Sequence, residues 1–60
     1  MNVQVKILSN DDYNSLAFDV RSYINENSKP EDVVDIKYST VFDSLKNQII
    51  YSALVYIEHK

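Results

Sequence analysis

The sequence predicts an α+β domain of order β-α-β-β, in which a three-stranded sheet carries one helix on one face. Apolar residues alternate with polar ones near the N-terminus and again along two later segments, which is typical of strands. Between these segments apolar residues recur at helical spacing, and the single proline follows that stretch. A chain of 60 residues has room for one domain, so we assign residues 1–60 to it.

The first strand is predicted at residues 2–7, where "NVQVKI" alternates polar and apolar side chains. Ser9 or Asn10 is then expected to cap a helix, and Asp11 and Asp12 suit the positive N-terminal end of that helix. The helix is predicted to run from Asp11 to about Asn27. Its buried stripe contains Tyr13, Leu16, Ala17, Val20, Tyr23 and Ile24.

Pro30 ends the helical segment, because proline cannot continue a helix and favours an extended residue before it. Residues 33–42 form the second predicted strand, rich in β-branched and aromatic side chains. The loop "DSLKN" then makes a hairpin without glycine, so Asn47 or Asp43 is expected to take any left-handed position. The third strand is predicted from residue 48 onward.

The third strand is apolar on both sides, which predicts a central position between the other two. A right-handed crossover through the helix would leave the outer strands parallel to each other. The face expected beneath the helix carries Val3, Val5, Ile7, Val34, Ile36, Tyr38, Tyr51, Ala53, Val55 and Ile57. The face expected to stay uncovered carries Gln4, Lys6, Leu8, Val33, Asp35, Lys37, Ser39, Val41, Ile50, Ser52, Leu54 and Tyr56.

Composition limits the classes of function. The net charge of −3 argues against a non-specific nucleic-acid binder, and the lack of glycine excludes a glycine-rich phosphate loop. No segment is apolar enough for a signal peptide or a membrane span, so a cytoplasmic protein is expected. Such a small domain is marginally stable, and without cysteine it has no disulfide to help it. We therefore expect a homo-oligomer.

Two segments carry a family resemblance: "DIKY" at residues 35–38, and residues 50–56, of the type Ile-Tyr-x-x-x-hydrophobic-Tyr. With the short N-terminal strand and acidic helix, they resemble a family of very small acidic sporulation proteins of Bacillus and related Firmicutes, which also has relatives in phages. The resemblance covers nearly the whole chain and implies a Firmicute or phage protein of the cytoplasm. It brings no catalytic residues with it, and it does not choose between a sporulation role and an inhibitor role.

The residues that could take part in catalysis or metal binding indicate a protein that is not an enzyme and needs no cofactor. Asp11–Asp12 and Glu31–Asp32 are adjacent carboxylates, which do not face one pocket as acid–base catalysis requires. They are expected to cap the helix and to be solvated in a turn. His59 is the penultimate residue and is expected to be frayed and without a partner, so neither catalysis nor a metal site is predicted there.

Two surfaces of the predicted fold are suited to contact with another protein, and they lead to the predicted function. The chain is expected to be a small interaction module, encoded by a bacterium or by a phage, that regulates or inhibits a bacterial protein. The predicted anchors are Phe18 and Arg21 on the outer helix face, and Ile50, Leu54 and Tyr56 on the open sheet face. One alternative is an oligomer that sequesters a nucleotide-like signal. Its binding site would consist of Lys6, Lys37 and Tyr56. The other alternative is a structural protein of the spore.

Overall fold

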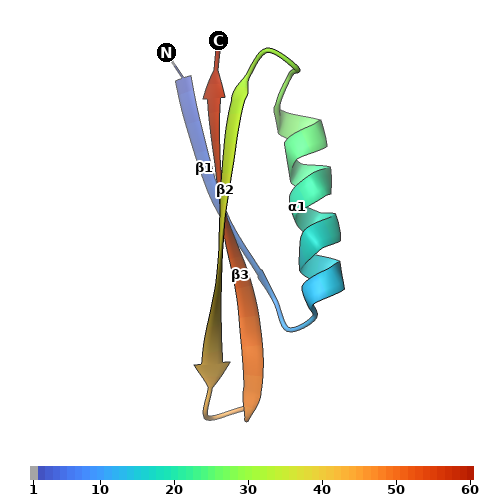
Figure 1. Cartoon of the computed structure of the whole chain (residues 1–60), viewed down its shortest axis with the longest axis vertical. Helices are drawn as coiled ribbons and strands as arrows, with labels where there is room; N and C mark the ends of the chain where they lie inside the picture. The colour runs from blue at the N-terminus through green and yellow to red at the C-terminus, as the bar shows by residue number, and fades with distance from the viewer. Residues whose placement is uncertain (1) are drawn as a thin grey trace.

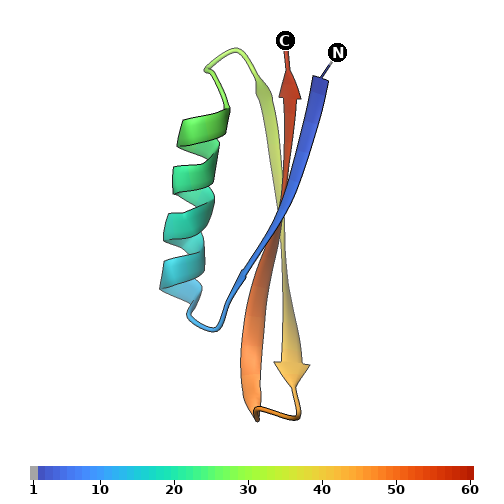
Figure 2. The same ribbon diagram turned by 180° about the vertical axis from the view of Figure 1, so that it is seen from behind.

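The computed structural model describes residues 2–60 and shows three strands and one helix, β1 (Asn2–Asn10), α1 (Tyr13–Asn27), β2 (Val33–Asp43) and β3 (Gln48–His59) (Figure 1). The sheet order is β1-β3-β2, and β3 runs antiparallel to both neighbours. This confirms the predicted α+β architecture with the third strand at the centre. Figure 2 shows that β1 begins, and β3 ends, at the same end of the molecule.

The observed helix cap lies two residues beyond Asn10, the later of the two capping residues expected from the sequence. Asp12 is the N-cap, and its carboxylate accepts hydrogen bonds from the backbone N–H and the hydroxyl of Ser15, at 3.1 and 2.7 Å. Asn10 still belongs to β1, and its Oδ1 accepts from the backbone N–H of Asp12 at 2.9 Å. The prediction of Ser9 or Asn10 as cap is therefore wrong, because the turn needs Asn10 to hold Asp12 in place.

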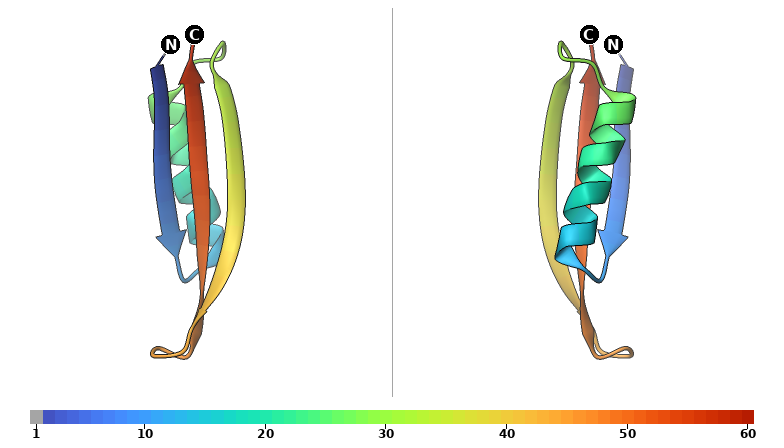
Figure 3. Two further views of the ribbon diagram at one scale, coloured as in Figure 1. Left: turned by 90° about the vertical axis from the view of Figure 1, so that its left-hand side faces the viewer. Right: turned by 90° about the vertical axis from the view of Figure 1, so that its right-hand side faces the viewer.

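The core is a single layer between α1 and the sheet. Leu16 and Val20 of the helix pack against three residues of the central strand, Ala53, Val55 and Ile57. Each of these five side chains is at most 2% exposed. The helix contacts β1 and β3, whereas most of β2 lies beside it (Figure 3). Burying a side chain such as Leu16 contributes about 1.5–3 kcal/mol to stability. A core of this size therefore leaves a small domain only marginally stable.

The β2–β3 hairpin projects beyond the rest of the sheet. The last residue of β1, Asn10, pairs with Tyr51, so residues 41–50 extend past β1 as a two-stranded ribbon (Figure 1). Asn47 takes the left-handed conformation at φ 53°, which confirms one of the two positions predicted for it. Asp43 closes the loop by accepting from the backbone N–H of Leu45 at 3.1 Å. The side chain of Leu45 is 96% exposed at the tip.

The two faces of β1 are reversed relative to the sequence prediction. Residues directly opposite each other across antiparallel strands share a face, and Leu8 lies opposite the buried Ala53. Gln4 also points to the helix, since its Nε2 donates to the Tyr23 hydroxyl at 2.6 Å. Gln4, Lys6 and Leu8 therefore lie on the helix side, and Val3, Val5 and Ile7 lie on the open face. The faces predicted for β2 and β3 are correct.

Candidate functional site

The open face of the sheet is built from rows of three residues, with one residue of β3 in the middle of each row. Tyr56 lies between Val5 and Asp35, and the next row places Leu54 between Ile7 and Lys37. The left panel of Figure 3 shows this face with the helix behind the sheet. Because no element of residues 2–60 covers it, every side chain in these rows can meet another molecule.

The apolar side chains of these rows form one surface, which we call the open-face patch. It consists of Val3, Val5, Ile7, Val33, Leu54 and Tyr56. The three residues of β1 are 48%, 56% and 68% exposed in chain order, and Leu54 is 37% exposed. The reversal of β1 creates this patch, because it places three apolar residues beside the anchors predicted on β3.

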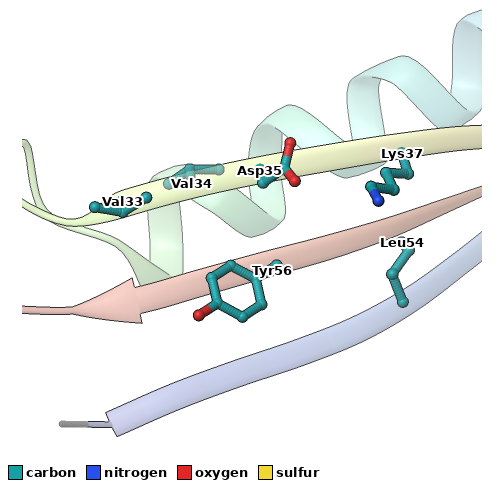
Figure 4. Close-up of a pocket in the computed structure, with 6 residues that line it drawn as sticks. All are labelled: Val33, Val34, Asp35, Lys37, Leu54 and Tyr56. Carbon is teal, nitrogen blue, oxygen red and sulfur yellow. The ribbon is translucent and has the colours of Figure 1, made fainter.

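A shallow groove runs along the β2 side of the open-face patch. Its volume is about 520 Å³, and its lining consists of Val33, Val34, Asp35, Lys37, Leu54 and Tyr56 (Figure 4). The Tyr56 hydroxyl donates to Glu58 Oε1 at 3.1 Å, and this bond, with some desolvation, raises the pKa of Tyr56. The groove thus has an apolar floor on β3 and one side chain of each charge on β2.

A row of serines separates the open-face patch from the projecting hairpin. Ser9, Ser52 and Ser39 lie side by side across the sheet, and the hydroxyls of Ser39 and Ser52 are hydrogen-bonded at 2.7 Å. Ile50, one of the predicted anchors, lies beyond this row and pairs with Val41. The structure therefore brings Leu54 and Tyr56 together and places Ile50 on the same face but apart from them.

The three residues of the predicted nucleotide site do not come together. Lys37 and Tyr56 both line the groove on the open face. Lys6 lies opposite Val55, a residue buried beneath the helix, so it belongs to the other side of the sheet. The prediction that Lys6 and Lys37 share a face is wrong, since it depended on the reversed assignment of β1.

The predicted helix anchors form a surface of their own. Phe18 is 69% exposed, which agrees with its expected position away from the buried stripe of α1. Arg21 follows it by three residues and is also exposed. Because α1 covers the face of the sheet opposite the open-face patch, a partner seated flat on the patch would not reach Phe18. The binding roles of Phe18 and Arg21 stay predictions.

His59 has partners, contrary to the sequence prediction of a frayed residue. Its Nδ1 lies 3.0 Å from Asp32 Oδ2, and its Nε2 lies 3.1 Å from Gln4 Oε1. The Asp32 side chain is only 3% exposed and also accepts from the backbone N–H groups of Lys29 and Lys60, at 2.9 and 3.1 Å. These N–H groups are the main cause that lowers the pKa of Asp32. The expectation of a merely solvated Glu31–Asp32 turn is therefore wrong for Asp32.

This corner network ties together the two ends of the chain and the end of the helix. Gln4 extends it by donating to Tyr23 and to Asn27 Oδ1, the latter at 3.1 Å. An Asp–His pair can activate a hydroxyl or thiol, but here the third position is the amide of Gln4, which has no nucleophilic atom. Across residues 2–60 no three His, Asp or Glu side chains are arranged to hold a metal ion. The hydrogen bonds of this network join segments that are distant in sequence, and we call the network the clasp.

Comparison with models of protein families, with curated protein sequences and with solved structures finds no match to this chain. The resemblance to sporulation proteins thus stays a prediction. In the part of the chain that the structure describes, α1 is too short and too polar to cross a membrane.

Proposed function

We propose that this chain is a non-enzymatic interaction module, which regulates or inhibits a bacterial protein by docking its open-face patch onto an apolar surface of that protein. The observation that supports the proposal is the exposure of five neighbouring apolar side chains, beside the half-buried Tyr56, on a face without a covering helix. Grouped apolar surface of this kind is unusual on a small monomer and marks contact sites. Single exposed apolar residues would carry no such argument.

The layout of the open face resembles that of a protein interface. Apolar side chains occupy β1 and the centre of β3, while Asp35 and Lys37 stand at the β2 border and the serine row closes one end. Interfaces commonly combine an apolar centre with a polar rim. The side chains stand on three paired strands, so little backbone entropy is lost when a partner binds.

A nucleotide-like ligand is a weaker fit to the same face. Only Lys37 of the two predicted lysines faces the groove, and the carboxylate of Asp35 lies two residues from it on the same strand. Negative phosphate groups would be attracted by one charge and repelled by the other. A protein surface with its own polar rim can satisfy both charges, so we favour a protein partner.

The setting we propose follows from the sequence. A chain without cysteine needs no oxidising compartment, which agrees with action in the cytoplasm. The resemblance to sporulation proteins and their phage relatives favours a Firmicute protein as the target, with the module encoded by the bacterium or by a phage. A structural role in the spore would be distinguished by expression restricted to sporulation.

The test begins with affinity purification of the tagged chain from its native host, followed by titration of the purified partner. Ile7→Ser and Leu54→Ser each remove an apolar side chain from the open-face patch. We expect each to weaken binding about tenfold or more, because central apolar contacts are worth roughly 1–2 kcal/mol or more.

Ile49→Ser is the matched control, since Ile49 is 49% exposed but lies opposite Phe42 on the helix side of the hairpin. It should leave the binding constant unchanged. A partner that binds both open-face variants as tightly as the parent chain would show that this patch is not the docking surface.

A further inference from the structure

β2 is a free sheet edge that has neither a proline nor a bulge to prevent pairing with another strand. Within residues 2–60 its only strand partner is β3, and the register between them continues from Val33 to Asp43 without a bulge. The strand contains no proline, and its 11 residues make it longer than the other edge strand, β1. Natural sheets blunt such edges with prolines, bulges, charges or a covering helix. An edge left this open is suited to pairing with another strand.

β2 is also exposed on both faces, since α1 lies over β1 and β3 (Figure 3). On the helix side Val34 is 37% and Tyr38 is 53% exposed, and on the open face Val33 is 44% exposed. A further strand beside β2 would cover apolar side chains on both faces at once. A strand paired along the free edge would therefore bury more of the exposed apolar surface of β2 than a layer packed on one face.

Two of the three charged residues of β2, Asp35 and Lys37, are arranged to match a second copy of the same strand. Asp35 and Lys37 flank Ile36 and share the open face. In an antiparallel pair, directly opposite residues lie on the same face, so a two-fold axis between identical strands must pass through a residue. An axis at Ile36 places Asp35 of each copy opposite Lys37 of the other. Axes at Asp35 or at Lys37 would instead oppose like charges, and the full-length register, with its axis at Tyr38, would pair neither residue with an opposite charge.

The other edge does not match itself in this way. Pairing of β1 with a second β1 over its full length, Asn2–Asn10, centres on Lys6. The two ammonium groups would then lie directly opposite each other, and like charges in that position are destabilising. Lys6 is the single charged residue of β1, so no register of β1 with itself pairs opposite charges, whereas the Ile36 register of β2 does so twice.

We propose that β2 pairs antiparallel with β2 of a second copy of this chain, about a two-fold axis at Ile36. The result is one continuous sheet of order β1-β3-β2-β2-β3-β1, with both helices on one face. Both open-face patches lie on the opposite face, so the dimer presents two docking surfaces side by side and can bind a partner bivalently. Dimer formation is measured on the purified chain alone. A chain that stays monomeric would overturn this proposal but would not contradict the proposed docking of a bacterial protein.

Charge reversal tests the pairing. Asp35→Lys or Lys37→Asp makes both cross-strand pairs repulsive, and we expect either variant to dimerise at least about tenfold more weakly than the parent in analytical ultracentrifugation. Mixing the two variants restores opposite charges at both pairs, so the mixture should form a heterodimer. Asp19→Lys and Lys46→Asp are exposed controls with the same charge changes away from β2, and should leave the dimer intact.

The register is tested independently by cysteine crosslinking, because the natural chain contains no cysteine. Ile36→Cys should form a disulfide-linked dimer on oxidation, whereas Tyr38→Cys should not, since each Tyr38 lies opposite Val34 of the other copy in this register. Circular dichroism confirms that each variant is folded. A monomeric parent chain, a dimer unaffected by charge reversal, or crosslinking through Tyr38→Cys alone would each overturn the proposal.

Discussion

The two faces of β3 show how differently this chain uses apolar residues of the same strand. Ala53 and Val55 are at most 1% exposed beneath the helix, whereas Leu54 between them is 37% exposed on the open face. The helix is the only cover available within residues 2–60, and it lies on one side. Apolar residues of β3 therefore serve as core on one face, and on the other face they belong to the surface that we propose as the contact site.

β1 makes the contrast sharper, because its more apolar side is the one without a cover. Gln4 and Lys6 point to the helix side, while Val5 and Ile7 point to the open face. Gln4 is accommodated there by hydrogen bonds to Tyr23 and Asn27. The helix side of β1 thus contributes a polar clasp, and the open side contributes half of the patch.

The largest expected effect comes from comparing one apolar deletion on each face. Leu16→Ala leaves a cavity in the core, where Leu16 is 1% exposed, and should cost about 2–5 kcal/mol. Ile7→Ala removes a side chain that is 68% exposed and should change stability by about 0.5 kcal/mol or less. Urea unfolding at one protein concentration measures both, since dimerisation makes stability depend on concentration. Similar losses for both variants would mean that the open face is buried in solution.

The hydrogen-bonded carboxylates of Asp32 and Asp12 should make the stability of the fold depend on pH in the acid range. Hydrogen bonds from Lys29 and Lys60 lower the pKa of Asp32, and those from Ser15 lower the pKa of Asp12, both from an ordinary value of 3.8. A carboxyl whose folded-state pKa is depressed stabilises the fold above its unfolded pKa, and this contribution is lost as pH falls through the folded value.

The melting temperature should therefore fall by several degrees as pH drops below about 4. Asp32→Asn should make that fall shallower, because it removes one of the two carboxyl groups whose pKa is lowered, and it should start from a lower melting temperature at neutral pH. Asp12→Asn is the matched comparison, because asparagine still caps a helix and should keep the neutral-pH stability closer to that of the parent. Thermal melts between acid and neutral pH follow both variants. A pH profile unchanged by Asp32→Asn would contradict the role given to its carboxylate.

The element order could be predicted from the sequence because each element has a local signal. Alternation marks the strands, Pro30 marks the end of the helical segment, and Asn47 supplies the left-handed residue of the glycine-free loop. A strand apolar on both sides was correctly placed at the centre. These signals lie within a few residues of what they determine.

The orientation of β1 and the partners of His59 could not be predicted in the same way. An alternating strand fits the sheet with either side inward, and the rule that the apolar side faces the core chose wrongly for Val3, Val5 and Ile7. His59 and Gln4 are 55 residues apart in sequence, so no local pattern brings them together. The separation of Lys6 from Lys37 follows from the first error.

A smaller effect is expected at the clasp. His59→Ala removes two hydrogen bonds, to Asp32 and Gln4, from a side chain that is 30% exposed. Net contributions of partly exposed hydrogen bonds are small, and we expect a loss of about 1 kcal/mol in urea unfolding. His59→Gln is a useful comparison, since an amide can replace part of the bonding. Loss of partner binding by a folded His59→Ala variant would contradict a purely structural role.

The smallest effect on stability is expected for Phe18→Ala, which tests an apolar residue that belongs to neither face of the sheet. Phe18 is 69% exposed on α1, so its removal opens no cavity and alanine suits a helix at least as well. Unfolding free energy should change by about 0.5 kcal/mol or less.

If Phe18 is an anchor, its loss should weaken partner binding roughly thirtyfold, since a buried aromatic contact is worth about 2 kcal/mol. Arg21→Ala, on the same exposed side of α1, should then weaken binding too. The comparison with Ile7→Ser and Leu54→Ser in the same titration decides which surface the partner uses. Because the helix and the open-face patch lie on opposite sides of the sheet, a single rigid partner should respond to one pair of substitutions and ignore the other.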